Sequence, residues 1–303
     1  MPLSYRVLPY LDMGKRSKDK RDIYYRLAKS DGWRARSAYK LIQIDEKFKI
    51  LDEVRRVVDL CAAPGSWSQV LSKRLRADDP NTDTKIVAVD LMIMAPIDGV
   101  TCICGDITKG ETAKEIVNQF DGSLADLVVC DGAPDVSHKS DFDEYVQSYL
   151  VLSALNISTL ILKPGGTFLA KIFRGKDVNR VYAKLKQFFT EVMCVKPKCC
   201  RNSSIEAYVL CKNYSPPVNY EPTMRALLPL KETSDFLTLS QSTNAIVPFI
   251  CCGEESPYDA DMCYPVELDA EGKHVPLPPV QEPISPPYAK YLMMKRNNEL
   301  PKY

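Results

Sequence analysis

Two lysines and two carboxylates occupy positions that could bring them to one pocket. Lys171 interrupts the apolar run 168–173, and a lysine inside such a run is rare unless its ammonium is paired or used. Asp131 ends one apolar run, Glu206 begins another, and Lys40 ends a basic segment near the N-terminus. Considered alone, Lys171 could instead be an edge residue whose side chain reaches solvent. Glu206 alone could be an exposed charge on a hairpin. Together the four side chains form a candidate catalytic group.

A tight turn after the first expected strand predicts a ligand site. The segment 59–69 reads Asp-Leu-Cys-Ala-Ala-Pro-Gly-Ser-Trp-Ser-Gln and opens a helix. A strand, a turn and a helix N-terminus form the usual ligand crevice of a doubly wound sheet. A dinucleotide requires Gly-x-Gly-x-x-Gly for its pyrophosphate, and only Gly65 is present. S-adenosylmethionine has no phosphate and needs one small turn for its methionine end, so it is the expected cofactor.

Two further carboxylates end successive strands beside this turn. Asp90 is placed to bind ribose hydroxyls, and Asp106 is placed to bind an adenine amino group. Either aspartate alone could be a helix cap, and a single glycine turn occurs in most α/β folds. The order and spacing of the Gly65 turn, Asp90 and Asp106 along the chain indicate a cofactor site far more specifically than any one of these residues does.

Alternating apolar runs predict the scaffold for these residues. Strands are expected at 57–61, 86–90, 101–104, 125–131, 167–172, 191–196 and 206–212, and helices at 66–75, 113–120, 142–162 and 177–189. This alternation predicts an α/β fold of Rossmann-like type: a mostly parallel seven-stranded sheet with helices on both faces. No helix separates the last two runs, which are therefore expected to form an antiparallel hairpin at the sheet edge.

Composition narrows the class of protein. The 303 residues are 45% hydrophobic and 26% charged, values typical of a folded globular chain. The most apolar stretch, 150–162, is interrupted by polar residues and is too short to cross a bilayer. The start of the chain has no apolar leader, the eleven cysteines include no Cys-x-x-Cys, and there are only two histidines. We therefore expect reduced thiols, no metal site, no membrane association and a cytoplasmic location.

Charge is distributed unevenly along the chain. Residues 15–40 hold ten lysines and arginines against three aspartates, a net charge of +7 in a chain whose total is +1. Such an arm can contact phosphates, and its aromatic residues could stack on unpaired bases; these are Tyr24, Tyr25, Trp33 and Tyr39. The alternative is a solvated helix face whose aromatic residues make core contacts.

Three segments follow from these patterns. Residues 1–13 are an N-terminal extension, residues 14–215 are the catalytic domain with its basic arm at 15–40, and residues 216–303 are a proline-rich C-terminal extension. Fourteen of the 22 prolines lie in the last segment, which argues against much regular structure there. Its apolar run 245–250 leaves two alternatives, a disordered tail or one that packs on the domain or binds a partner.

The sequence over residues 15–214 resembles the FtsJ-like ribose 2′-O-methyltransferases. This resemblance implies a class I methyltransferase fold that uses S-adenosylmethionine, and its catalytic Lys-Asp-Lys-Glu tetrad matches at Lys40, Asp131, Lys171 and Glu206. The family's cofactor positions fall on Gly65, Trp67, Asp90, Asp106 and Asp131.

Within that family the chain is similar to the eukaryotic branch that acts on the tRNA anticodon loop. The similarity rests on the segments 17–26, 131–136, 201–206 and 283–288. It implies methylation of nucleotide 32, nucleotide 34 or both. It also implies an auxiliary protein that selects the position, a WD-repeat protein for 34 or a helical-repeat protein for 32.

Lys171 is the expected general base or steering group for the attacking ribose hydroxyl. Carboxylate neighbours favour its charged form, whereas burial and cationic neighbours oppose it. Ribosomal RNA or mRNA cap methylation would use the same four residues and stays open. A small-molecule methyltransferase would not need the basic arm, and an intact tetrad argues against a noncatalytic RNA-binding protein.

Overall fold

The computed structural model describes residues 22–134, 140–223, 245–266, 268–281 and 294. The extension 1–13 and the first part of the basic arm lie outside the described residues. So do residues 17–21 of the segment 17–26 and the whole of the segment 283–288, which carry part of the family resemblance.

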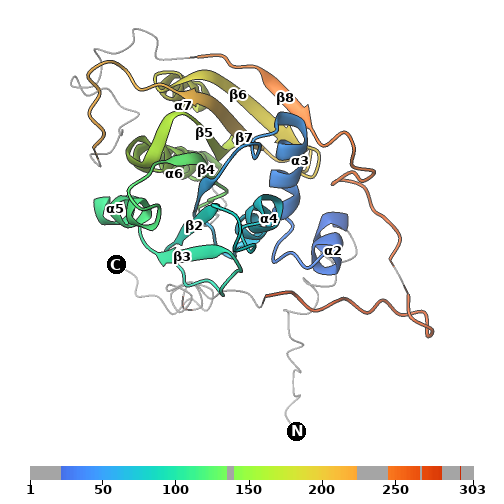
Figure 1. The fold of residues 1–303 in the computed structure, drawn as a ribbon. Coiled ribbons are helices and arrows are strands. Elements are labelled where there is room, and N and C mark those ends of the chain that lie inside the picture. The colour runs from blue at the N-terminus through green and yellow to red at the C-terminus, as the bar shows by residue number, and fades with distance from the viewer. Residues whose placement is uncertain (1–21, 135–139, 224–244, 267, 282–293, 295–303) are drawn as a thin grey trace.

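One eight-stranded sheet forms the centre of the molecule (Figure 1). Its order is β3-β2-β1-β4-β5-β7-β6-β8. The first five strands in this order run parallel, β7 is antiparallel to both β5 and β6, and β8 runs parallel to β6. The strands are β1 (Arg56–Leu60), β2 (Lys85–Asp90), β3 (Val100–Cys104), β4 (Ala125–Cys130), β5 (Leu162–Phe173), β6 (Phe189–Pro197), β7 (Glu206–Tyr214) and β8 (Phe249–Cys252).

Helices cover both faces of the sheet, as predicted. On one face α5, α6 and α7 bury Ile116, Leu155 and Leu185 against the strands, and on the other α3 and α4 bury Leu41 and Leu71 (Figure 1). The central strands are continuous apolar runs because helices cover them on both sides. The helices are α2 (Ile23–Ser30), α3 (Ala38–Phe48), α4 (Ser66–Leu75), α5 (Gly110–Gln119), α6 (Ser140–Ile161) and α7 (Val178–Leu185).

The expected strand count of seven is wrong by one. The additional strand, β8, comes from the proline-rich tail and pairs with β6, so the β6–β7 hairpin exists but does not form the sheet edge. The Cys194 amide donates to the Pro248 carbonyl at 2.8 Å, and the Lys198 amide donates to the Cys252 carbonyl at 2.8 Å. An apolar segment can thereby satisfy the backbone groups that β6 would otherwise leave open.

The tail then crosses the basic arm. Ala260, Tyr258 and Tyr264 pack against Ile23 and Tyr24 of α2. The Tyr24 hydroxyl lies 2.8 Å from the Ser256 hydroxyl and donates to the Tyr258 carbonyl at 3.0 Å. Figure 1 shows this tail, in orange, passing beside α2 after it leaves β8.

No helix of the described part of the chain is both long and apolar enough to span a bilayer.

Candidate active site

The fold brings all four predicted catalytic residues together at the carboxyl ends of the parallel strands. Asp131 follows β4, and the register pairs Cys130 with Ala170, which places Asp131 beside Lys171 on β5. The antiparallel register of β5 and β7 sets Glu206 two positions from the partner of Lys171. Lys40 comes from the first turn of α3. Three neighbouring strands and one helix therefore position the ionic group.

Each lysine of this group has its own carboxylate partner. The Lys171 ammonium lies 2.9 Å from Asp131 Oδ1 and donates to the Asp131 carbonyl at 3.0 Å, while Glu206 Oε2 is 4.0 Å away. The Lys40 ammonium lies 2.8 Å from Glu206 Oε1 and 3.8 Å from Asp131 Oδ1. Lys171 is 7% exposed, which rules out the alternative of a solvent-reaching edge residue.

Burial and charge act in opposite directions on this group. Burial alone would lower the pKa of Lys40, but the carboxylates of Asp131 and Glu206 outweigh it and raise that pKa. Burial alone would raise the pKa of Glu206, but Lys40 and Lys171 lower it to about 2. At neutral pH the Lys40–Glu206 pair is therefore ionised, and Glu206 is not an isolated hairpin charge.

Three polar residues that the sequence analysis missed support the group. The Tyr208 hydroxyl donates to Asp131 Oδ1 at 2.7 Å, and the Cys200 thiol donates to Glu206 Oε1 at 3.2 Å. The Gln147 amide donates to the Lys171 carbonyl at 2.8 Å. Tyr208 was detectable in principle, since residues two apart on a strand share a face, whereas the contacts of Cys200 and Gln147 depend on distant chain segments.

The predicted cofactor turn has the expected geometry. Gly65 has φ of 103°, and a Cβ at this position would lie 2.8 Å from Ile97 and 2.9 Å from the Arg34 guanidinium. A side chain here would therefore be strained and would crowd Ile97 and Arg34. Trp67 is 2% exposed, packs 5.6 Å from the Tyr208 ring and donates its indole N–H to the Ser37 carbonyl. Its side chain is part of the layer beneath the ionic group.

The two strand-end carboxylates come at the ends of the neighbouring strands β2 and β3 and already accept backbone hydrogen bonds. Asp90 accepts from the Ala63 amide at 2.9 Å and from the Met92 amide at 2.8 Å. Asp106 accepts from the amide and the hydroxyl of Thr108 at 2.8 and 2.7 Å through one oxygen, Oδ1. The Gly105 amide donates to the Asp90 carbonyl at 2.9 Å, which fixes the two strand ends against each other.

A buried aspartate that the sequence analysis passed over lies at the base of the crevice. Burial and the charges of Asp131 and Asp90 together raise the pKa of Asp59 to about 7, against the opposing effect of a hydrogen bond from Ser68 at 2.6 Å. Its Oδ1 is buried and has no hydrogen-bond partner among the described residues. The site thus concentrates negative charge, which a bound cation would relieve.

Two arginines of the described part of the basic arm bind groups of the domain. Arg34 donates to the carbonyls of Pro64, Ala95 and Pro96, and Arg36 pairs with Asp22 and donates to the Cys199 carbonyl. These two arginines hold the arm on the domain.

The aromatic residues of the arm divide into two pairs. Tyr24 is buried, and Tyr39 packs against it and donates to Asp31, so these two make the core contacts of the alternative reading. Tyr25 and Trp33 are half-buried and keep exposed surface.

The chain belongs to the FtsJ-like methyltransferase family, whose profile matches residues 33–214. A tRNA (cytidine(32)/guanosine(34)-2′-O)-methyltransferase of Mus musculus is 54% identical over 291 residues, which cover 96% of this chain and 89% of that protein. An enzyme of the same name from Schizosaccharomyces pombe is 48% identical over 94% of this chain and 99% of its own. A solved structure assigned as a ribosomal RNA methyltransferase of Plasmodium falciparum matches with a TM-score of 0.54 at 29% identity, over 60% of this chain and 98% of that one.

Proposed function

We propose that this protein is an S-adenosylmethionine-dependent 2′-O-ribose methyltransferase of the tRNA anticodon loop, acting on nucleotide 32, nucleotide 34 or both. The observation that carries the chemistry is the buried ionic group, in which Lys171 contacts two oxygens of Asp131 while Lys40 neutralises Glu206. The choice of RNA is supported by relatives of that name at about half identity over nearly the whole chain.

The donor set of the crevice fits S-adenosylmethionine. The Gly65 turn would hold the methionine end, Asp90 would bind the ribose hydroxyls, and Asp106 would bind the adenine amino group. Asp131 would face the reacting end, and Trp67 would support the turn from below. The cofactor carries positive charge, which suits a site where carboxylates raise the pKa of Asp59. When bound, it supplies an electrophilic methyl group.

Lys171 is the residue that contacts the attacking hydroxyl in this proposal. Two of its three N–H directions are taken by the Asp131 carboxylate and carbonyl, and Glu206 Oε2 lies beyond hydrogen-bond distance. The remaining direction would be taken by the ribose 2′-hydroxyl. The ammonium can then orient this oxygen, and its neutral form can accept the proton. Holding the oxygen in line with the methyl group contributes by positioning.

The substrate and partners follow from the same proposal. The basic arm would contact phosphates of tRNA. An auxiliary protein, a WD-repeat protein for nucleotide 34 or a helical-repeat protein for nucleotide 32, would select the position in the cytoplasm. The tail, residues 216–303, offers exposed apolar side chains for docking such a partner, Ile246 and Met262 among them.

The test is site-resolved mapping of 2′-O-methylation in tRNA from cells that lack this protein. Rescue with wild type should restore methylation at 32, 34 or both, whereas Lys171→Ala should not. Lys114→Ala, at an exposed position of α5, is the matched control and should rescue fully. Unchanged methylation at every tRNA site in the deletion strain would refute the tRNA assignment, and ribosomal and cap RNA would then be mapped in the same strain.

A further inference from the structure

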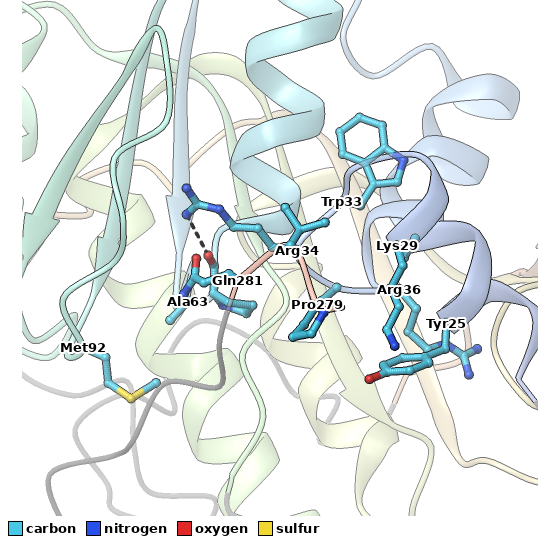
Figure 2. Close-up of a pocket in the computed structure, with 13 residues that line it drawn as sticks. Tyr25, Lys29, Trp33, Arg34, Arg36, Ala63, Met92, Pro279 and Gln281 are labelled. Atoms are coloured by element: carbon cyan, nitrogen blue, oxygen red, sulfur yellow. Dashed lines mark hydrogen bonds between the residues drawn. The ribbon is translucent and has the colours of Figure 1, made fainter. Parts of the chain in front are cut away.

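A second pocket lies beside the cofactor turn, outside the ionic group. Its volume is about 330 Å³, within the lower range of ligand sites. Tyr25, Lys29 and Trp33 form one wall, Ala63 and Met92 form the opposite wall, and the tail segment 279–281 closes the third side (Figure 2). None of the cofactor carboxylates lines it.

The pocket combines aromatic rings with positive charge. The Lys29 ammonium lies 4.7 Å from the centre of the Tyr25 ring, and the Lys73 ammonium lies 5.3 Å from the centre of the Trp33 ring. Arg34 donates only to backbone carbonyls and has no carboxylate partner among the described residues. The lining residues include no aspartate or glutamate. Half-buried aromatic residues beside cations are the features with which proteins bind unpaired nucleotides.

The pocket is physically continuous with the reaction site. The Ala63 amide, on its wall, donates to Asp90 Oδ2 at 2.9 Å. Arg36, also on its wall, lies one helical turn before Lys40, and the Ser37 hydroxyl lies 2.6 Å from that of Ser66 at the start of α4. The pocket therefore shares the 63–66 turn and the segment before Lys40 with the reaction site, so an RNA strand bound at Lys171 could place a neighbouring nucleotide in it.

The tail wall is an addition to the family domain. The family profile ends at residue 214, whereas Pro279, Val280 and Gln281 come from the segment that follows β8. Earlier in the tail, Arg26 of α2 donates to the carbonyls of Tyr264 and Pro265 at 3.1 and 2.6 Å.

We propose that this pocket binds an unpaired nucleotide next to the methylated one, stacked on Tyr25, and that the tail segment 279–281 is thereby part of the RNA-binding surface. The inference rests on the proposed function and deepens it. The features that carry it are the uncompensated Arg34 charge, the two half-buried aromatic residues and the third wall supplied from the tail.

The experiment measures RNA affinity with variants on two different sides of the pocket, the α2 side and the tail side. Tyr25→Leu removes the ring and Tyr25→Phe keeps it, while Val280→Trp fills the pocket from the tail side. Val218→Trp, at a position that is 88% exposed and away from the pocket, is the matched control for the added indole. The full chain, purified with the proteins that accompany it, is titrated with an anticodon stem-loop RNA, and S-adenosylmethionine affinity is measured by calorimetry.

We expect Tyr25→Leu and Val280→Trp to raise the Kd for the stem-loop by about 5- to 150-fold, the range for loss of one stacked base. Tyr25→Phe and Val218→Trp should bind RNA like wild type, and all four should keep wild-type cofactor affinity. The slope of log Kd against log salt should not change with Tyr25→Leu, because no phosphate contact is removed. One abasic substitution beside the target should weaken wild-type binding and have no further effect in Tyr25→Leu.

Two results would overturn the inference in distinguishable ways. If the wild-type protein does not methylate the stem-loop, the proposed function fails and the inference fails with it. If wild type methylates but both Tyr25→Leu and Val280→Trp retain its RNA affinity, the inference alone fails. Loss of a co-purifying protein with RNA affinity retained would identify a protein-docking pocket and refute it as well.

Discussion

Replacing Glu206 with glutamine tests the electrostatic reading of the ionic group. Glutamine has nearly the shape of a protonated glutamate, so Glu206→Gln imitates the neutral carboxyl without opening a cavity. The wild-type carboxylate accepts from Lys40 at 2.8 Å and from Cys200 at 3.2 Å. The variant therefore weakens the bond to Lys40 while leaving that lysine buried.

The magnitude follows from the lowered pKa of Glu206. Burial opposes the charged form, but Lys40 and Lys171 lower the pKa from 4.5 to about 2. Each tenfold change in proton affinity corresponds to about 1.4 kcal/mol, so the ionised carboxylate contributes about 3 kcal/mol. Because the folded-state pKa is below the unfolded-state value, this stability is complete above about pH 4.5 and disappears as the pH falls toward 2. At pH 3.5 about 2 kcal/mol should remain.

The assay is urea denaturation of wild type and Glu206→Gln at several values of pH from 7 down to 3.5. At pH 7 the variant should lose about 3 kcal/mol, a lowering of Tm by roughly 6–12 °C. Glu115→Gln, at an exposed position of α5, is the control and should lose less than about 0.5 kcal/mol. A loss that stays the same at pH 7 and pH 3.5 would show that it does not come from ionisation of Glu206, and the reasoning would be refuted.

Three further outcomes are expected. Cys200→Ala should lower stability by about 1 kcal/mol and reduce methylation, because Glu206 loses a hydrogen-bond donor. Cys200→Ser should restore both stability and methylation. Equal losses in the two variants would show that packing, not the hydrogen bond, is responsible. Asp59→Asn should stabilise the cofactor-free protein more at pH 8 than at pH 5, since a pKa raised to about 7 makes ionisation of the folded state costly as the pH rises. Calorimetry should show weaker cofactor binding by this variant. A gain in stability that does not depend on pH would contradict the argument from ionisation of Asp59. Arg36→Gln should lower Tm through loss of its bonds to Asp22 and the Cys199 carbonyl, yet leave the salt dependence of RNA binding unchanged; a reduced salt slope would show that Arg36 contacts phosphate after all.

The sequence was sufficient to predict that the four residues of the ionic group lie together, because their positions depend on local patterns. Asp131 and Lys171 lie in or directly after apolar runs, and parallel strands align their carboxyl ends at one edge of the sheet. The buried lysine was informative because an unpaired ammonium is costly in a core. The roles of these residues and of the cofactor set remain predictions for experiment.

The contacts that the sequence did not predict depend on distant pairings. Cys200 reaches Glu206 because a turn joins β6 to β7, and β8 exists because β6 offers an unpaired edge to a segment about fifty residues further along the chain. The net charge of the arm, counted from the sequence, likewise overestimates how many of its cations are available to bind phosphate. Arg34 and Arg36 look like phosphate ligands in sequence, but their nearest acceptors are carbonyls that only the fold brings into range.

The tail and the ionic group are linked through the arm. Tail residues cover Tyr24 on α2, and Arg36 binds both Asp22, the residue that caps this helix, and the Cys199 carbonyl. Arg36 lies one turn before Lys40, and Cys199 precedes the thiol that donates to Glu206. The chain segments that carry Lys40 and Cys200 are therefore both held by Arg36. The tail packs against α2, the helix whose cap, Asp22, binds this arginine. A tail that shapes the RNA pocket would for this reason also help to hold the arm in its catalytic position.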